Sequence, residues 1–118
     1  MAAGKLDLMI EKGAKFTKHL EYKDKSKVAI DLTGYTARMQ ARKNPQSSST
    51  IIDLTTENGG ITITALTGEI DLFLSGADTT AIVERGNLVY DLELVEPGPG
   101  EPIKLIRGTI SLIEEITK

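Results

Sequence analysis

Apolar and polar residues alternate along several short runs of this chain. In Tyr35–Arg42 the odd-numbered residues are apolar and the even-numbered residues are polar. Leu88–Leu94 gives a further example, and the runs Ile61–Ala65 and Ile70–Leu74 repeat the pattern. A period of two places successive side chains on opposite faces of a β-strand. The chain is therefore predicted to form strands that each bury one face against a common core.

Compact turn signals separate these runs. Glu57–Gly60 contains the Asn-Gly pair that tight hairpin turns favour, because both central residues of such turns need a positive φ. This signal predicts that Ile51–Thr55 and Ile61–Ala65 form a hairpin. Thr67-Gly68 and Pro97–Pro102 mark two more short connections. Strands joined by links this short are expected to pair antiparallel.

Two segments interrupt the alternation. Ala77–Glu84 has helical chemistry, with Ser75 as a predicted N-cap and Gly86 as a predicted stop signal. We therefore expect one short helix over about residues 77–84. In Leu105–Gly108 the apolar positions change from odd to even numbers, which predicts a β-bulge.

These elements together predict an all-β fold. About eight short strands with one helix are typical of an antiparallel sandwich or barrel, and we favour an antiparallel β-sandwich with an immunoglobulin-like layout. The chain has 118 residues, which is one domain's worth of sequence. Residues 1–118 are accordingly predicted to form a single sandwich domain around one core.

Composition excludes several kinds of site. The chain has no Cys, which removes disulfides, thiolate zinc sites, iron–sulfur clusters and cysteine nucleophiles. The formal net charge is −3, so the overall field does not attract nucleic acid or an anionic membrane. No apolar run approaches the ~20 residues needed to cross a bilayer. We expect no cofactor, no metal, no membrane association and no nucleic-acid partner.

His19 is the single histidine, so it decides most catalytic and metal hypotheses. It lies in a predicted strand between Lys18 and Leu20. A solvent-facing strand histidine is the favoured interpretation, and the chain is predicted not to be an enzyme. The enzyme hypothesis would need His19 to lie beside two carboxylates in a cleft.

The best candidate for a contact surface is the polar face of the first alternating run. Arg38, Gln40 and Arg42 share that face, and Lys43 follows directly. Nucleic-acid binding would usually add aromatic residues to such a face, whereas Tyr35 falls on the other one. Asp91 and Glu93 share a face of their own strand and could pair with these arginines. The predicted interface residues are Arg38, Arg42, Asn44, Gln46, Pro97 and Pro99.

Some of these runs also resemble a known group of proteins. Ile30–Arg42, Leu54–Ile63 and Val89–Leu94 are similar to segments of small proteins encoded in the structural gene clusters of tailed phages and prophages. The resemblance covers roughly residues 13–118. The layout is also similar to the N-terminal β-sandwich of the baseplate upper proteins of siphophages.

This resemblance implies a virion component of the tail, the baseplate or the head–tail region, assembled in the bacterial cytoplasm. Its partners would be other virion proteins and copies of itself, in a symmetric homo-oligomeric assembly. The resemblance carries no catalytic residue over to this chain. The alternative is a β-sandwich module that binds a host receptor or glycan. An assembly subunit should bury large subunit interfaces, whereas a receptor module should leave a pocket free at a loop end.

Overall fold

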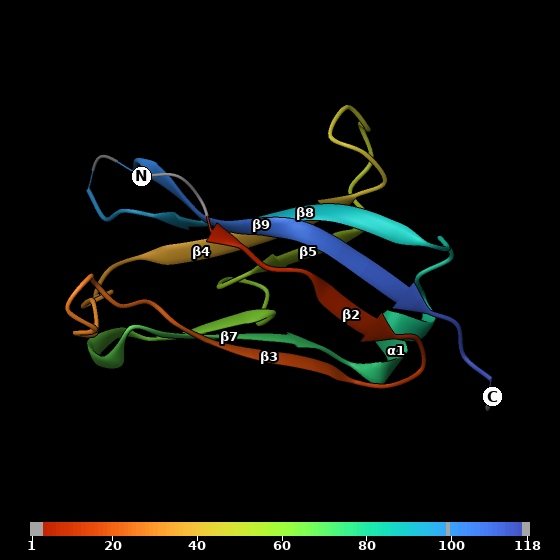
Figure 1. The fold of residues 1–118 in the computed structure, drawn as a ribbon, viewed down its shortest axis with the longest axis horizontal. Helices are drawn as coiled ribbons and strands as arrows, with labels where there is room; N and C mark the ends of the chain where they lie inside the picture. The colour runs from red at the N-terminus through yellow and green to blue at the C-terminus, as the bar shows by residue number, and fades with distance from the viewer. Residues whose placement is uncertain (1–3, 99, 117–118) are drawn as a thin grey trace.

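Two sheets packed face to face make up the computed structural model, which describes residues 4–98 and 100–116 (Figure 1). The larger sheet has six strands in the order β1-β9-β8-β4-β5, with β2 also paired to β9. The smaller sheet has three strands in the order β3-β7-β6. The strands of the six-stranded sheet are β1 (Gly4–Lys5), β2 (Leu8–Glu11), β4 (Thr36–Arg42), β5 (Ile52–Thr55), β8 (Asn87–Val95) and β9 (Pro102–Ile113). The three-stranded sheet contains β3 (Phe16–Glu21), β6 (Ile61–Thr64) and β7 (Glu69–Leu74).

The core lies between the inner faces of the two sheets. Alternate residues of β4, β7 and β8 are buried there, as the period of two predicts. Fully buried side chains come from both sheets, including Ile10, Met39, Ile70, Leu72 and Leu92. The prediction of an all-β sandwich is therefore confirmed.

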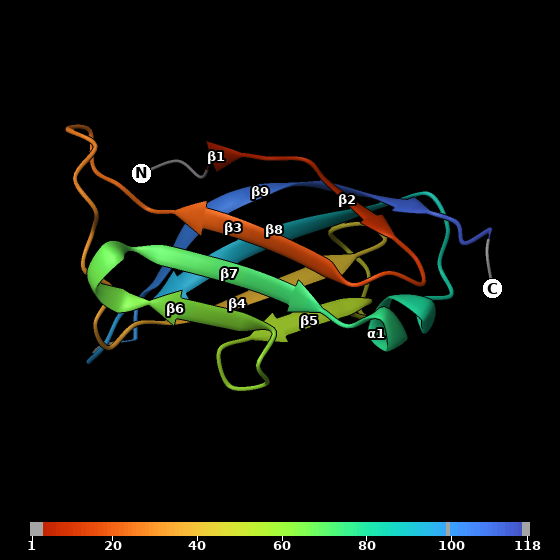
Figure 2. The same cartoon turned by 90° about the horizontal axis from the view of Figure 1, so that it is seen from below.

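The two N-terminal strands depart from the predicted antiparallel pairing. Both β1 and β2 run parallel to β9, with Leu8 opposite Ile110. The chain crosses to the other sheet directly after β2, so β2 forms no hairpin with β3 and lies along β9 instead (Figure 2). The hydroxyl of Tyr90 donates a hydrogen bond to the carbonyl oxygen of Leu6, and burial raises the pKa of Tyr90 to about 12. This phenol remains a donor that fixes the segment between β1 and β2.

The predicted hairpin around Asn58 is wrong. β5 pairs with β4 and β6 pairs with β7, so the turn passes from one sheet to the other. The Asn58 side chain still organises the turn, because its Oδ1 accepts hydrogen bonds from the backbone N–H groups of Thr55 and Gly60, both at 2.9 Å. Crossing between sheets buries Leu54 and Ile61 in one core from opposite sides. The predicted β6–β7 and β8–β9 hairpins are confirmed.

The predicted bulge is present, and the predicted helix is shorter than expected. Leu92 pairs with Ile106 and Glu93 pairs with Lys104, so Leu105 is the additional residue in β9. Helix α1 (Gly76–Thr80) begins at the predicted N-cap Ser75 but ends well before residue 84.

Anchoring of the helix to the N-terminal half of the chain explains its early end. The Thr79 hydroxyl donates to the carbonyl oxygen of Ala14 at 2.9 Å and accepts from the N–H of Gly13 at 3.1 Å. After the buried Ile82, the chain extends to β8, and the carbonyl of Gly86 accepts from the N–H of Leu112. This extended path leaves no room for a second helical turn.

Gly108 marks a close approach that only glycine permits. A Cβ at Gly108 would lie 2.1 Å from the carbonyl oxygen of Leu6, whereas a Cβ at Gly4 would meet only ordinary contacts at 3.6 Å or more. We predict that Gly108→Ala lowers the free energy of unfolding by about 1–3 kcal/mol, because overpacking against backbone cannot be relieved by a rotamer change. Urea denaturation measures the effect, with Gly4→Ala as the matched control. Equal stability of the two variants would contradict the prediction.

Candidate interaction surface

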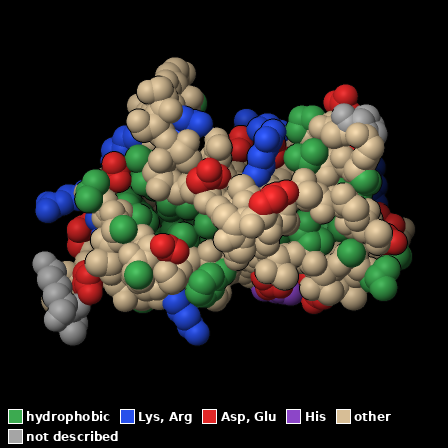
Figure 3. All heavy atoms as spheres, turned by 180° about the vertical axis from the view of Figure 1, so that it is seen from behind, with side chains coloured by type: hydrophobic (Ala, Val, Ile, Leu, Met, Phe, Trp, Pro, Cys, Tyr) green, Lys and Arg blue, Asp and Glu red, His purple; other side chains and the backbone are tan. Residues whose placement is uncertain are grey.

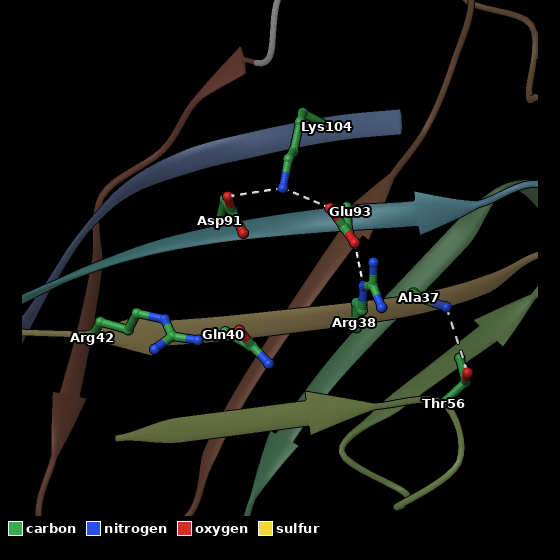
Figure 4. A network of polar contacts seen from close by, with 8 residues as sticks. All are labelled: Ala37, Arg38, Gln40, Arg42, Thr56, Asp91, Glu93 and Lys104. Atoms are coloured by element: carbon green, nitrogen blue, oxygen red, sulfur yellow. Dashed lines mark hydrogen bonds and ion pairs between the residues drawn. The ribbon is translucent and has the colours of Figure 1, made fainter. Parts of the chain in front are cut away.

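The outer face of β4 carries the predicted polar stripe. Ala37, Met39 and Ala41 are buried, so the intervening side chains of Arg38, Gln40 and Arg42 must point away from the core. In Figure 4 these three polar side chains follow β4, with Asp91 and Glu93 on the neighbouring strand β8. Core packing, and not the polar residues themselves, therefore fixes where this surface lies.

Glu93 is the centre of an ion-pair network on this surface. Its carboxylate accepts a hydrogen bond from Nε of Arg38 and a second one from Nζ of Lys104 at 2.6 Å (Figure 4). Lys104 also contacts Asp91, with Nζ 3.2 Å from Oδ2. In register, the row across β9, β8 and β4 reads Lys104, Glu93, Arg38, so the charges alternate in sign. Opposite charges at adjacent cross-strand positions stabilise a sheet.

Glu93 is buried despite its charge. Only 7% of its side chain is exposed, whereas 56% of Arg38 and 55% of Lys104 are exposed. Burial favours the neutral carboxyl, but the hydrogen bonds from Lys104 and Arg38 together outweigh it and hold the pKa of Glu93 below its ordinary value. The hydrogen bond to Glu93 raises the pKa of Lys104. Both groups are therefore ionised near neutral pH.

Arg42 connects the stripe to the adjoining loop. Its Nη2 donates to Oε1 of Gln40 at 2.9 Å, and its Nη1 donates to the carbonyl oxygen of Ser47 at 2.9 Å. The side chains of Asn44 and Gln46 are exposed in this loop, where Oδ1 of Asn44 accepts from the N–H of Gln46 at 3.0 Å. The loop projects outward from the six-stranded sheet (Figure 1). The structure thus brings four predicted interface residues together.

The remaining two predicted interface residues belong to the β8–β9 connection. Pro97 is exposed beside Gly34, and the connection is closed by a hydrogen bond from the N–H of Glu96 to the carbonyl of Glu101. Pro99 lies outside the described residues. In Figure 1 this connection is at the opposite end of the sandwich from the loop that carries Asn44. The six predicted residues therefore do not form one contiguous patch.

Three further cations on this face were missed by the sequence analysis. Lys5, Lys104 and Arg107 line a shallow depression of about 710 Å³ together with Arg42. Lys5 and Arg107 are neighbours in register between β1 and β9. The alternation of Lys5 with Leu6 and Leu8 was a signal that Lys5 faces outward, but the sequence did not indicate which strand lies beside it.

His19 faces solvent on the outer side of the three-stranded sheet, as predicted. Its Nδ1 lies 2.7 Å from Oδ1 of Asp71, and its Nε2 lies 3.5 Å from Oε1 of Glu69. Figure 3 shows the histidine in purple next to acidic side chains in red at the lower margin of the view. Within residues 4–98 and 100–116, no three His, Asp or Glu side chains are grouped so that they could hold a metal ion. No helix in the same part of the chain is long and apolar enough to cross a membrane.

The first prediction for this surface concerns Glu93. Glu93→Gln removes the charge that Arg38 and Lys104 share, and we expect a loss of about 1–2 kcal/mol of unfolding free energy at pH 7, below the cost for fully buried pairs because both cations are half exposed. Asp91→Asn, at an exposed carboxylate with one partner, is the matched control and should change stability by about 0.5 kcal/mol or less. Urea denaturation measures both variants.

The difference in stability between the wild type and Glu93→Gln is predicted to depend on pH. A carboxyl whose pKa is lowered on folding stabilises the folded state above its unfolded pKa, here 4.5, and that stabilisation is lost as the pH falls through the folded-state pKa. The stability difference between the wild type and Glu93→Gln should therefore narrow below pH 4.5. If the difference in unfolding free energy stays constant down to strongly acidic pH, the charge of Glu93 does not stabilise the fold.

The second prediction concerns His19. The hydrogen bond to Asp71, followed by the nearby acidic charges, raises the pKa of His19 above 6.5. NMR titration of the imidazole should give a midpoint above 6.5, and Asp71→Asn should lower that midpoint. Asp53→Asn, at an exposed carboxylate on the other sheet, is the control and should leave it unchanged. An unaltered midpoint in Asp71→Asn would contradict the assigned pair.

Comparison of the sequence with known proteins does not assign this chain to a family. A scan against models of protein families finds none that matches the chain. A search of curated proteins also finds no match. The interpretation of the outer faces therefore depends on their own residues and geometry.

Proposed function

We propose that this chain is a non-enzymatic structural component of a tailed-phage virion, in the tail, the baseplate or the head–tail region. It acts through contacts with copies of itself and with other virion proteins. The observation that carries this proposal is the outer face of the six-stranded sheet, where ionised side chains are held on a rigid sheet and are not enclosed in a cleft. The phage context comes from the resemblance of residues 13–118 to small phage structural proteins.

A rigid charged face suits recognition of another protein. The side chains of Arg38, Glu93 and Lys104 are held by hydrogen bonds on adjacent strands, and the inward-facing residues of β4 and β8 are buried. Pre-arranged charges steer association and exclude wrong partners more than they add affinity. Such a surface supports a subunit that must join its neighbours in one defined orientation.

The free strand edges support the same role. β5 is an edge of the six-stranded sheet, and β3 and β6 are the two edges of the three-stranded sheet. Edge strands offer unpaired backbone N–H and C=O groups to a neighbouring chain. Strands β5, β3 and β6 are short, at four, six and four residues, which limits uncontrolled pairing. Each of these edge strands can still pair with a strand of a neighbouring subunit in an assembly.

One observation favours the alternative, a module that binds a host receptor or glycan. A groove of about 430 Å³ opens between β5 and α1. Its lining includes the apolar side chains of Ile52, Leu54 and Leu74 and the polar side chains of Asp53 and Asp78. Figure 3 shows apolar side chains exposed within a hollow of this surface. A groove with an apolar floor and polar groups at its margin is typical of small-ligand sites.

The proposed function is tested by the association state of the chain. Light scattering and analytical ultracentrifugation should reveal oligomers, and electron microscopy of the particle should place the chain in interfaces that bury more than ~1,000 Å². A monomer that binds host-surface glycans through the groove beside α1 would overturn the proposal in favour of the alternative.

The loop that carries Asn44 and Gln46 gives a specific prediction. Deleting residues 46–49 should leave the melting temperature nearly unchanged, because these side chains are mostly exposed, but should weaken assembly. Replacing the same four residues with alternating Gly and Ser is the control that keeps the loop length. Assembly that is as strong after the deletion as before would remove this loop from the proposed interface.

A further inference from the structure

Two pairs of like charges lie on opposite outer faces of the sandwich. Lys5 and Arg107 are neighbours in register between β1 and β9. Glu21 and Glu69 are neighbours in register between β3 and β7. Like charges at adjacent cross-strand positions destabilise a sheet. Each outer face therefore carries one like-charge pair.

The basic pair is only partly compensated within the subunit, by Asp91 opposite Arg107 and by Asp7 near Lys5. Among residues 4–98 and 100–116, neither Lys5 nor Arg107 forms an ion pair, and both side chains are exposed. The depression that they line contains Arg42 and Lys104 as well, against the single carboxylate of Asp91. Asp91 forms its ion pair with Lys104. The lining of this depression therefore has an excess of positive charge, with four cations against one carboxylate.

The acidic pair lies on a surface of opposite sign. Asp71 is next to Glu69 on the outer face of β7, one alternation further along the strand. Lys23 pairs with Glu21 at 3.4 Å, so it neutralises one of these three carboxylates. The other two have His19 as their neighbouring base. Phe73, which is 44% exposed, adds an apolar contact area to the same face.

The two charged surfaces are placed so that a translated copy could join them. In Figures 1 and 2, β1, the end of β3 and the start of β7 all lie toward the end of the molecule that holds the β8–β9 connection. Each like-charge pair spans neighbouring strands, so both pairs have the same spacing of about 5 Å. The sheet faces lie along the two directions in which the whole molecule, loops included, measures 43 and 26 Å. A side of this outline has room for a standard interface of ~800 Å² per partner.

We propose that copies of this chain stack face to back, with the basic depression on the outer face of the six-stranded sheet of one copy against the acidic outer face of the three-stranded sheet of the next. Lys5 and Arg107 of one copy then neutralise Glu21 and Glu69 of its neighbour. The inference rests on the proposed function, in that it names the partner as a second copy. Because two different surfaces meet, the contact is heterologous and generates a ring or an open filament.

Charge reversal on each face tests the stacking. Lys5→Glu with Arg107→Glu makes both faces acidic, and Glu21→Lys with Glu69→Lys makes both faces basic. Each double variant alone should associate at least tenfold more weakly than the wild type in analytical ultracentrifugation at low salt, because like charges then meet. Lys15→Glu with Lys25→Glu is the matched control for Lys5→Glu with Arg107→Glu, since it makes the same charge change at exposed positions outside the strands.

The decisive measurement is whether association returns when the two charge changes are combined. A mixture of the two double variants, and one chain that carries all four substitutions, should regain association because opposite charges face each other again. Circular dichroism checks that each variant is folded. If a double variant does not fold, Arg107→Glu alone and Glu69→Lys alone provide the same comparison.

The outcomes separate this inference from the proposed function. A wild type that assembles, with both charge variants assembling equally well, overturns the stacking and leaves the proposed function intact. Weakened assembly without restoration in the mixture also overturns it. A wild type that remains monomeric at low salt overturns the stacking and removes self-assembly from the proposed function.

Discussion

Burial of alternate residues in β4 and β8 is the constraint on which the rest of the structure depends. Met39 and Leu92 are partners in register, and both are fully buried. A slip of one residue in either strand would exchange such a side chain for Arg38 or Glu93 and would bury a charge in the core. The core therefore locks the register, and the locked register places Glu93 between its two cationic neighbours. The ion-pair network is a consequence of the order in the sheet, since exposed ion pairs alone contribute little to stability.

The same reasoning explains which parts of the fold were predictable. The alternating strands and the bulge near Leu105 depend on local periodicity, and the structure confirms them. Strand partners depend on the path of the whole chain, and this is where the predictions were wrong. The turn at Asn58 has hairpin chemistry but joins two sheets, and Leu54 and Ile61 on either side of it are buried in the core between them. The helix ends at Thr80, since contacts of Thr79 with residues 13 and 14 prevail over the local helical pattern.

The candidate surface was predictable to a similar extent. Arg38 and Arg42 could be assigned to one face because they alternate with core residues of their own strand. Lys5 and Arg107 come from opposite ends of the chain, and only the parallel pairing of β1 with β9 makes them neighbours. Burial of Glu93 also depends on the fold, because the long side chains of the flanking cations cover its carboxylate. Periodicity therefore indicates which side chains face outward, but not which charges meet.

The unequal sheets also determine what kind of assembly the charged faces permit. One outer face belongs to six strands and the other to three, so a contact between them cannot be self-complementary and must give the assembly a direction. Each face is twisted, which means that a neighbouring copy mates best when it is rotated as well as translated. Along the stacking direction the whole molecule, with its projecting loop included, measures 28 Å. The angle of rotation then decides whether the series of copies closes into a ring or continues as a helical filament. Because the loop that carries Asn44 and Gln46 projects from the same face, it would contact the next copy and restrict that angle.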